Sequence, residues 1–284
     1  MIVDLVEEGY HIVVTHGNGP QVGDILLQND VAAKSVPPSP LDACVAESQG
    51  LIGYMLIQGM DNEFRKRGID MQTLCVLTRT VVREDDPAFG HPSKPIGDYY
   101  TEEQSRQLRR EKGWEMVSDE ARGGYRRIVP SPEPVGIMEE ELLKTFFRSR
   151  DNSREILVLS GGGGIPVVRK GGGYRGVEAV IDKDLAAQVV ATSLGVDHLF
   201  ILTDVDAVYL DFGTESQRRL GRATTGEMRK LIWEREFGKG SMLPKVEAAV
   251  RFVEAGGRSA IITSQERIFH AIRGEDGTTI TSSE

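Results

Sequence analysis

Short apolar segments alternate with helical segments along this 284-residue chain. Five of them have the length and composition of buried strands: His11–Thr15, Met71–Leu77, Glu155–Leu159, His198–Leu202 and Ser259–Thr263. Between them lie helical patterns over residues 22–34, 41–67, 139–147, 182–194, 225–234 and 244–254. This alternation predicts an α/β fold with a mainly parallel, open sheet covered by helices on both faces, that is, a three-layer αβα sandwich.

Residues 84–127 interrupt this alternation. The segment contains Pro87, Pro92 and Pro95, carries many charges and shows little periodicity apart from an expected helix over Glu102–Lys112. We therefore expect an inserted subdomain that projects from a single domain formed by residues 1–284. The chain as a whole divides into an N-terminal half, 1–165, which contains this inserted segment, and a C-terminal half, 166–284.

Composition and charge exclude several classes of protein. Forty-three acidic against 34 basic residues give a net charge of −9, which argues against binding to nucleic acid or an acidic membrane, so any anion site must be local. We find no leader and no apolar run near the roughly 20 residues that span a bilayer, and we expect a cytoplasmic protein. Cys44 and Cys75 lack metal-type spacing and are expected to be buried thiols without a disulfide.

Two glycine-rich loops follow predicted strands. The first glycine loop, residues 15–23, reads THGNGPQVG, and the second glycine loop, residues 160–164, reads SGGGG. Glycine allows backbone N–H groups to approach phosphate oxygens, and a following helix adds its positive end. A sharp turn is the alternative for either loop alone, but two such loops at strand ends favour an anion site. Neither loop has the spacing of a Walker motif or a dinucleotide fingerprint.

Three lysines stand in unusual settings. Lys94 lies in PSKPIG, whereas Lys183 and Lys245 stand at expected helix N-termini. A cation there opposes the helix dipole by about 0.3 to 1 kcal/mol, which indicates a recruited anion. A solvated lysine is the alternative, above all for Lys94. Asp182 is a candidate N-cap, and Asp184 would favour the dipole and hold the two lysines apart.

The segment LTDVDAVY, residues 202–209, ends a predicted strand in polar groups and continues into an apolar patch with Tyr209. A nucleotide base pocket and a plain strand turn are both compatible with it. The five histidines and two cysteines form no triad or metal cluster, which argues against covalent and metallohydrolase chemistry.

Several blocks resemble those of carbamate kinases in the amino acid kinase family, in that family's order and over nearly the whole chain: THGNGPQVG, LDACVAESQG, PSKPIG, SGGGGIPV, GVEAVIDKDL, LTDVDAVY and GSMLPKVEAA. The resemblance implies an αβα sandwich, a homodimer and reversible phosphoryl transfer between ATP and carbamate, run toward ATP from carbamoyl phosphate. Because the carbamate oxygen is already anionic, the chemistry needs alignment and charge neutralisation rather than a general base. Mg²⁺ would enter with ATP or ADP.

Roles follow from the resemblance by matching position. Lys183 and Lys245 would hold the phosphoryl groups and Asp184 would orient them. Lys94 would reach the carbamate or the transferring phosphoryl from the projecting subdomain, which would act as a lid. The carbamate side, in 1–165, would include Gly17, Asn18, Gly161, Gly162, Gly163 and Gly164. The nucleotide side, in 166–284, would include Thr203, Asp204, Val205, Tyr209 and Met242.

The sequence departs from the family pattern in two places. Leu243 replaces a glycine in the GSMLPK block, which affects the expected loop conformation but not Lys245. Family members also begin with a strand and a Gly-Gly-Asn loop, whereas this chain starts inside the following helix, so we expect one strand and one wall of the site to be missing. A non-catalytic, dimeric or nucleotide-binding fragment is therefore one alternative. A kinase for another acyl acceptor, such as acetylglutamate, is a second, against which PSKPIG argues.

Overall fold

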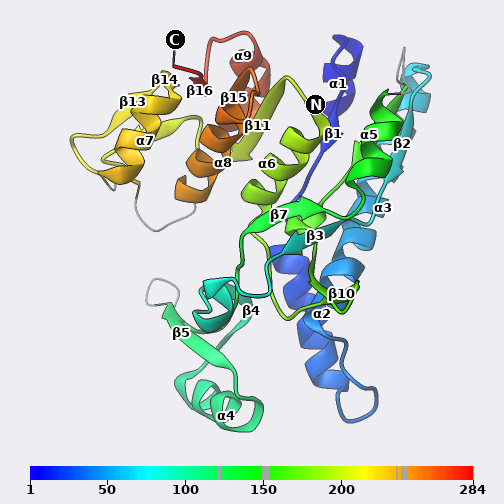
Figure 1. Ribbon diagram of the computed structural model, residues 1–284, viewed down its shortest axis with the longest axis vertical. Coiled ribbons are helices and arrows are strands. Elements are labelled where there is room, and N and C mark those ends of the chain that lie inside the picture. Colours follow the sequence, from blue (N-terminus) through cyan, green and yellow to red (C-terminus); the bar gives the residue numbers. More distant parts are fainter. Residues whose placement is uncertain (120–122, 149–153, 235, 238–241, 284) are drawn as a thin grey trace. The chain divides into compact units, whose positions relative to one another are not determined.

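The computed structural model describes residues 1–119, 123–148, 154–234, 236–237 and 242–283 (Figure 1). It divides into two compact units, Met1–Ala186 and Ala187–Glu284, whose boundary lies inside helix α6 (Lys183–Leu194). The division at residue 165 that we derived from the sequence falls within the first unit. Within the described ranges, no helix combines the length and apolarity that crossing a membrane requires.

The body of the first unit contains two sheets. One has the order β1-β8-β2 with all pairs parallel: β1 (Val13–Val14), β8 (Glu155–Val158) and β2 (Gln72–Cys75). The other has the order β10-β9-β3-β7: β10 (Gly173–Gly176), β9 (Ile165–Lys170), β3 (Arg79–Val82) and β7 (Pro134–Ile137). Its central pair, β9 with β3, is parallel, and the outer pairs are antiparallel.

Four helices accompany these sheets: α1 (Ile2–Glu7), α2 (Gly19–Ala32), α3 (Leu41–Arg67) and α5 (Glu140–Arg148). Helix α3 has the predicted bounds, because Gly68 adopts the left-handed conformation (φ 69°) that ends a helix after a basic last turn. Its Met60 and Phe64 pack with Ile156 and Val158 of β8 in one apolar cluster. This packing fixes α3 against the parallel sheet.

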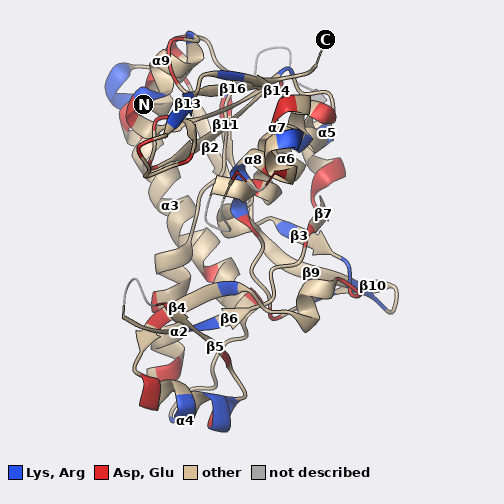
Figure 2. Cartoon of the chain, turned by 90° about the vertical axis from the view of Figure 1, so that its left-hand side faces the viewer, with Lys and Arg blue, Asp and Glu red and all other residues tan. Residues whose placement is uncertain are grey.

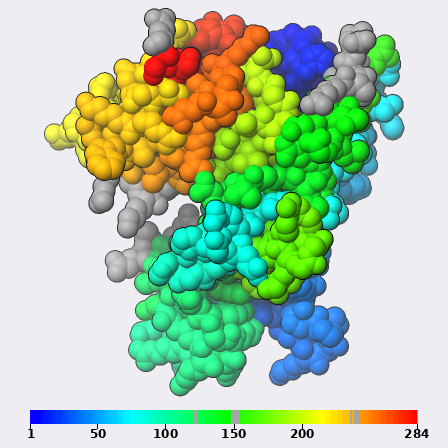
Figure 3. Space-filling view, viewed as in Figure 1, coloured from blue at the N-terminus to red at the C-terminus, as the bar shows by residue number. Residues whose placement is uncertain are grey.

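The lid subdomain contains a three-stranded antiparallel sheet in the order β4-β6-β5, with one helix: β4 (Lys94–Tyr100), α4 (Glu102–Lys112), β5 (Glu115–Asp119) and β6 (Gly124–Val129). Helix α4 has the predicted bounds and carries both signs of charge (Figure 2). In the space-filling view the subdomain forms a lobe beside the α2–α3 connection (Figure 3).

The sequence-based description of the lid was wrong on its strands. Only helix α4 was expected there, yet most of the lid's described residues belong to strands or to α4. These strands are short and largely exposed or half-buried, so they lack the apolar alternation that marks a strand in sequence. The last lid strand also continues to Val129, beyond the predicted limit at Arg127.

The second unit has a four-stranded sheet in the order β11-β15-β16-β14: β11 (His198–Thr203), β15 (Ser259–Ser264), β16 (Thr278–Thr281) and β14 (Arg222–Thr224). A hairpin and three helices accompany it: β12 (Val208–Leu210), β13 (Arg218–Leu220), α7 (Thr225–Trp233), α8 (Met242–Glu254) and α9 (Ile268–Ile272). Every residue of β15 is buried, which agrees with its sequence SAIITS, in which no residue is charged.

The α/β class with a projecting subdomain is confirmed, and the helix starts needed small corrections. Helix α2 begins at Gly19 rather than Val22, and α8 begins at Met242 rather than Pro244.

Both cysteines are free, but Cys75 is only half-buried, against the expectation that it is buried like Cys44. Helix α3 passes so close to this thiol that a Cβ on Gly53 would overlap Cys75 Sγ.

Candidate active site

The two glycine loops pack directly against each other. The Gly162 N–H donates to the His16 carbonyl at 2.8 Å. A Cβ on Gly161 would overlap the His16 ring, and a Cβ on Gly162 would overlap the Asn18 amide. Residues predicted for the carbamate side from two distant segments are therefore in direct contact in the first unit.

The second glycine loop uses its glycines for packing. Gly162, Gly163 and Gly164 have φ angles of 65°, 95° and 86°, which side chains disfavour. A Cβ on Gly163 would overlap the Ile181 carbonyl, and one on Gly164 would overlap Thr80 Oγ1. All five residues of the loop are buried.

The backbone amides of this loop are also engaged within the protein. The N–H groups of Gly162, Gly163 and Gly164 donate to the carbonyls of His16, Ser160 and Gly161 at 2.8, 3.0 and 3.1 Å. These three amides therefore stabilise the turns of the loop itself, as the sharp-turn alternative requires. That Gly161 to Gly164 line the carbamate site stays a prediction.

Helix α3 supports both loops through two neighbouring buried side chains. Asn18 Nδ2 donates to Ser48 Oγ at 2.8 Å. Gln49 Nε2 donates to the carbonyls of Gly161 and Thr78 at 3.0 and 3.2 Å, and its Oε1 accepts from the Thr78 N–H at 2.9 Å. We assigned no role to this pair from the sequence. The signal was present, since two adjacent polar residues interrupt a helix that packs on a sheet.

Helix α6 brings Lys183 to the first glycine loop. Asp182 caps the helix, because its Oδ1 accepts from the N–H groups of Asp184 and Leu185 at 3.0 and 3.3 Å. A Cβ on Gly17 would lie 3.5 Å from Lys183 Cδ and 4.0 Å from Nζ, so this side chain passes beside the glycine. Asp184 is 7% exposed. The predicted N-cap at Asp182 is observed, and the structure adds that Lys183 lies beside the first glycine loop.

Lys94 reaches the same helix N-terminus from the lid. Its Nζ donates to Asp182 Oδ2 at 2.9 Å. Burial alone would raise the pKa of Asp182. The Lys94 ammonium and the N–H donors of Leu185 and Asp184 outweigh burial, and the pKa lies below its usual value. The lid lysine therefore binds the helix cap Asp182, which directly precedes the phosphate-binding candidate Lys183.

The second unit carries the residues predicted for the nucleotide. Thr203 is the last residue of β11 and pairs with Ser264, and Asp204 and Val205 follow in a bend. The Tyr209 hydroxyl donates to Asp206 Oδ1 at 2.8 Å, and this bond raises the pKa of Tyr209. The Tyr209 ring lies 5.9 Å from that of Phe212, which is 66% exposed. The segment thus presents an aromatic pair, of which the sequence reading included only Tyr209.

Met242 and Lys245 lie in the first turns of α8. Lys245 is 5% exposed, an unusual burial for a lysine. Leu243 is helical, so the residue that replaces the family glycine does not interrupt the helix. Gly240 and Ser241 of the same block lie outside the described residues. That these second-unit residues act together with Lys183 stays a prediction.

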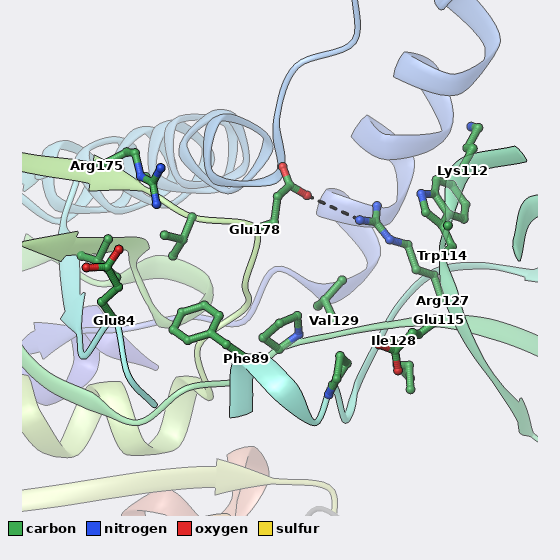
Figure 4. Close-up of a pocket in the computed structure, with 16 residues that line it drawn as sticks. Glu84, Phe89, Lys112, Trp114, Glu115, Arg127, Ile128, Val129, Arg175 and Glu178 are labelled. Carbon is green, nitrogen blue, oxygen red and sulfur yellow. Dashed lines mark hydrogen bonds and ion pairs between the residues drawn. The ribbon is translucent and has the colours of Figure 1, made fainter. Parts of the chain in front are cut away.

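A cavity of about 680 Å³ lies between the lid and the body of the first unit (Figure 4). Its walls include Trp114, Arg127 and Val129 of the lid and Arg175 and Glu178 of the body. Among the residues that the structure describes, the predicted catalytic lysines do not line it. In the same described ranges, no group of three His, Cys, Asp or Glu side chains is arranged to hold a metal ion.

Comparison with known proteins gives consistent results. The sequence profile of the amino acid kinase family matches residues 1–264. The carbamate kinase of Pyrococcus horikoshii is 45% identical over 282 residues, covering 99% of this chain and 88% of that protein. That of Halobacterium salinarum is 48% identical over 281 residues, covering 98% and 87%. Carbamate kinase from Giardia lamblia bound to AMP-PNP has a TM-score of 0.90 at 40% identity, covering 99% of this chain and 88% of that chain.

Proposed function

The chain belongs to the amino acid kinase family, and we propose that it catalyses reversible phosphoryl transfer between ATP and carbamate. The observation that carries the proposal is 45% identity to a carbamate kinase over 99% of the chain. The meeting of both glycine loops with Lys183 and Lys94 in the first unit supports it. The proposed physiological direction is ATP formation from carbamoyl phosphate and ADP, as in arginine breakdown.

The proposed mechanism needs no general base. The carbamate oxygen attacks the γ-phosphorus of ATP, the bond from that phosphorus to the β,γ-bridging oxygen breaks, and ADP leaves with the electron pair. Lys183 and Lys245 offset the negative charge on the transferred group, and Asp184 keeps the lysines oriented. Lys94 brings a further positive charge from the lid. These groups act by alignment and electrostatics, which supply most of the catalysis of phosphoryl transfer.

The proposed nucleotide is ATP or ADP, with Mg²⁺ entering on its phosphates. The related Giardia lamblia carbamate kinase binds AMP-PNP, an ATP analogue. In this chain, the exposed ring of Phe212 beside Tyr209 offers an aromatic surface for a base, near Thr203, Asp204 and Val205.

We propose a homodimer formed through an apolar surface on α3. Leu51, Tyr54 and Met55 of α3 are 48%, 61% and 63% exposed. These residues are three and four positions apart, so they share one exposed face of the helix. A contiguous apolar patch of this kind marks an association surface. The proposed compartment is the cytoplasm, where the free thiols stay reduced.

Turnover tests the function directly. The purified chain is incubated with carbamoyl phosphate and MgADP, and ATP is followed by a hexokinase-coupled assay. We expect ATP formation that falls by about 10² to 10³-fold in Lys183→Ala and in Lys245→Ala, with unchanged melting temperatures. Acetyl phosphate and acetylglutamyl phosphate serve as alternative donors. Turnover with one of these but not with carbamoyl phosphate contradicts the proposal.

Light scattering after size exclusion tests the dimer. We expect Tyr54→Glu combined with Met55→Lys to halve the measured mass, because two charges would be buried in an apolar interface. Lys66→Glu, at the C-terminal end of α3 where the lysine side chain is 76% exposed, serves as a control that leaves the mass unchanged. A wild-type mass equal to that of one chain contradicts the proposed dimer.

A further inference from the structure

One short body segment, residues 177–182, holds two basic side chains of the lid. Lys94 of β4 donates to Asp182 at 2.9 Å, and Arg127 of β6 contacts Glu178 at 3.4 Å, the bond drawn in Figure 4. The Val180 N–H also donates to the Pro130 carbonyl, just after β6, at 3.0 Å. The segment that continues into Lys183 therefore also contacts the lid.

The two ion pairs differ in their surroundings. The side chain of Asp182 is 13% exposed, whereas that of Glu178 is 54% exposed. Screening by water weakens the Arg127–Glu178 pair, while the Lys94–Asp182 pair is shorter and more buried. Asp182 also uses both carboxylate oxygens, Oδ1 for the backbone of α6 and Oδ2 for the lid lysine. It therefore joins Lys94 to the helix start that carries Lys183.

We propose that Asp182 is a positioning residue for the phosphoryl transfer, which holds the Lys94 ammonium beside the N-terminus of α6. The proposal rests on the proposed function. A lysine side chain has four flexible carbons and samples many rotamers unless a partner fixes it. An acidic group near two anionic substrates would repel them if it were unpaired. Lys94 and the positive end of α6 offset that charge, so the carboxylate can orient the lysine without excluding the substrates.

Two simpler roles are separated by the choice of variant. Asp182 could matter only as the cap of α6, and Asp182→Asn keeps an oxygen for the cap while it removes the charge. Asp182 could matter only because it attaches the lid. Glu178→Gln is the matched control for that role, since it breaks a second lid–body ion pair, with Arg127, and keeps an acceptor for the Leu41 N–H, which donates to Glu178 Oε1 at 2.8 Å.

Steady-state kinetics test the proposal with Asp182→Asn, Lys94→Met and the double variant. We expect Asp182→Asn to lower kcat/KM for carbamoyl phosphate by about 10- to 100-fold, with KM for ADP unchanged. The double variant should be no slower than Lys94→Met alone, because Asp182 acts through Lys94. Glu178→Gln should stay within about twofold of wild type. The proposal is overturned if the fold-losses of kcat/KM in the two single variants multiply in the double variant. It is also overturned if Asp182→Asn and Glu178→Gln lower kcat/KM equally.

Labelling tests the ion pair without turnover. The rate at which an amine-reactive reagent modifies Lys94, followed by mass spectrometry, should rise in Asp182→Asn and stay unchanged in Glu178→Gln. An equal rate in wild type and Asp182→Asn overturns the proposal even if the enzyme is active. Wild-type chain that makes no ATP overturns the proposed function instead. If Asp182→Asn lowers the melting temperature, Asp182→Ser, a strong helix cap without charge, replaces it in both experiments.

Discussion

Both glycine loops are rich in glycine, but they need this residue for different structural reasons. In the second glycine loop, three consecutive glycines have positive φ angles, and protein atoms fill the positions where side chains would begin. In the first glycine loop, Gly17 and Gly19 are exposed and lack positive φ angles, and Gly19 has open space around it. Glycine therefore serves the fold in the second loop. In the first loop, Gly17 leaves room for the Lys183 side chain.

The largest expected effect is a loss of stability caused by a substitution in the second glycine loop. Gly162→Ala should destabilise the protein by about 3 to 5 kcal/mol, because the methyl group combines a disfavoured φ with overlap on Asn18. Gly19→Ala, the matched substitution in the first loop, should change stability by less than about 1 kcal/mol. Urea unfolding of the two variants measures the difference. Equal stabilities would show that the second loop adapts and that the comparison is wrong.

A smaller effect concerns activity alone. Gly17→Val should lower kcat by about 10- to 100-fold with little change in stability, because its branched side chain displaces Lys183 from beside the loop. Gly17→Ala is the control, since its Cβ would sit at an ordinary 3.5 Å from Lys183 Cδ. Coupled-assay kinetics and thermal unfolding are measured together. A Gly17→Val variant that loses stability rather than kcat would assign this glycine to the fold as well.

The smallest expected effect is the pH dependence of the contact between the loops. Burial lowers the pKa of His16, and its bond to the Gly17 carbonyl acts in the opposite direction. Since the folded pKa lies below the unfolded value of about 6.5, this contribution to stability is complete above about pH 7.5 and is lost as the pH falls below about 6.5 and through the folded pKa.

His16→Gln should therefore reduce the loss of stability between pH 7.5 and 5.5 by less than about 1 kcal/mol. Urea unfolding at the two pH values measures it. His91→Gln, on the lid, is the control and should leave the pH dependence unchanged. A steeper dependence in His16→Gln would mean that the imidazole is stabilised in its charged form.

Local signals predicted the helices well and the small strands poorly. The predicted ends of α3 and α4 were correct because the residues that cap these helices lie next to them in the sequence. Helix α3 ends in a basic last turn and Gly68, and α4 begins with the Thr101 capping box and ends at Gly113. The lid strands were missed, because a half-exposed strand is defined by the partner with which it pairs and not by its own pattern.

The same limit applies to the site. Lys94, Lys183 and Asp184 were identified from motifs, and the structure brings them together at the N-terminus of α6. The partnership of Asp182 with Lys94 spans 88 positions in the sequence and was not predicted. Likewise, no pattern within the second glycine loop shows that its amides donate to His16, Ser160 and Gly161.

The sequence by itself determined the α/β class, the long helix α3, the resemblance to carbamate kinases and the identity of the charged groups, because caps, periodicity and motifs are properties of neighbouring residues. Only the tertiary structure decided which glycines pack, which amides are already engaged and which carboxylate holds the lid lysine. Those outcomes depend on contacts between segments far apart in the chain, and each is fixed by steric fit and by the need of buried polar groups for partners.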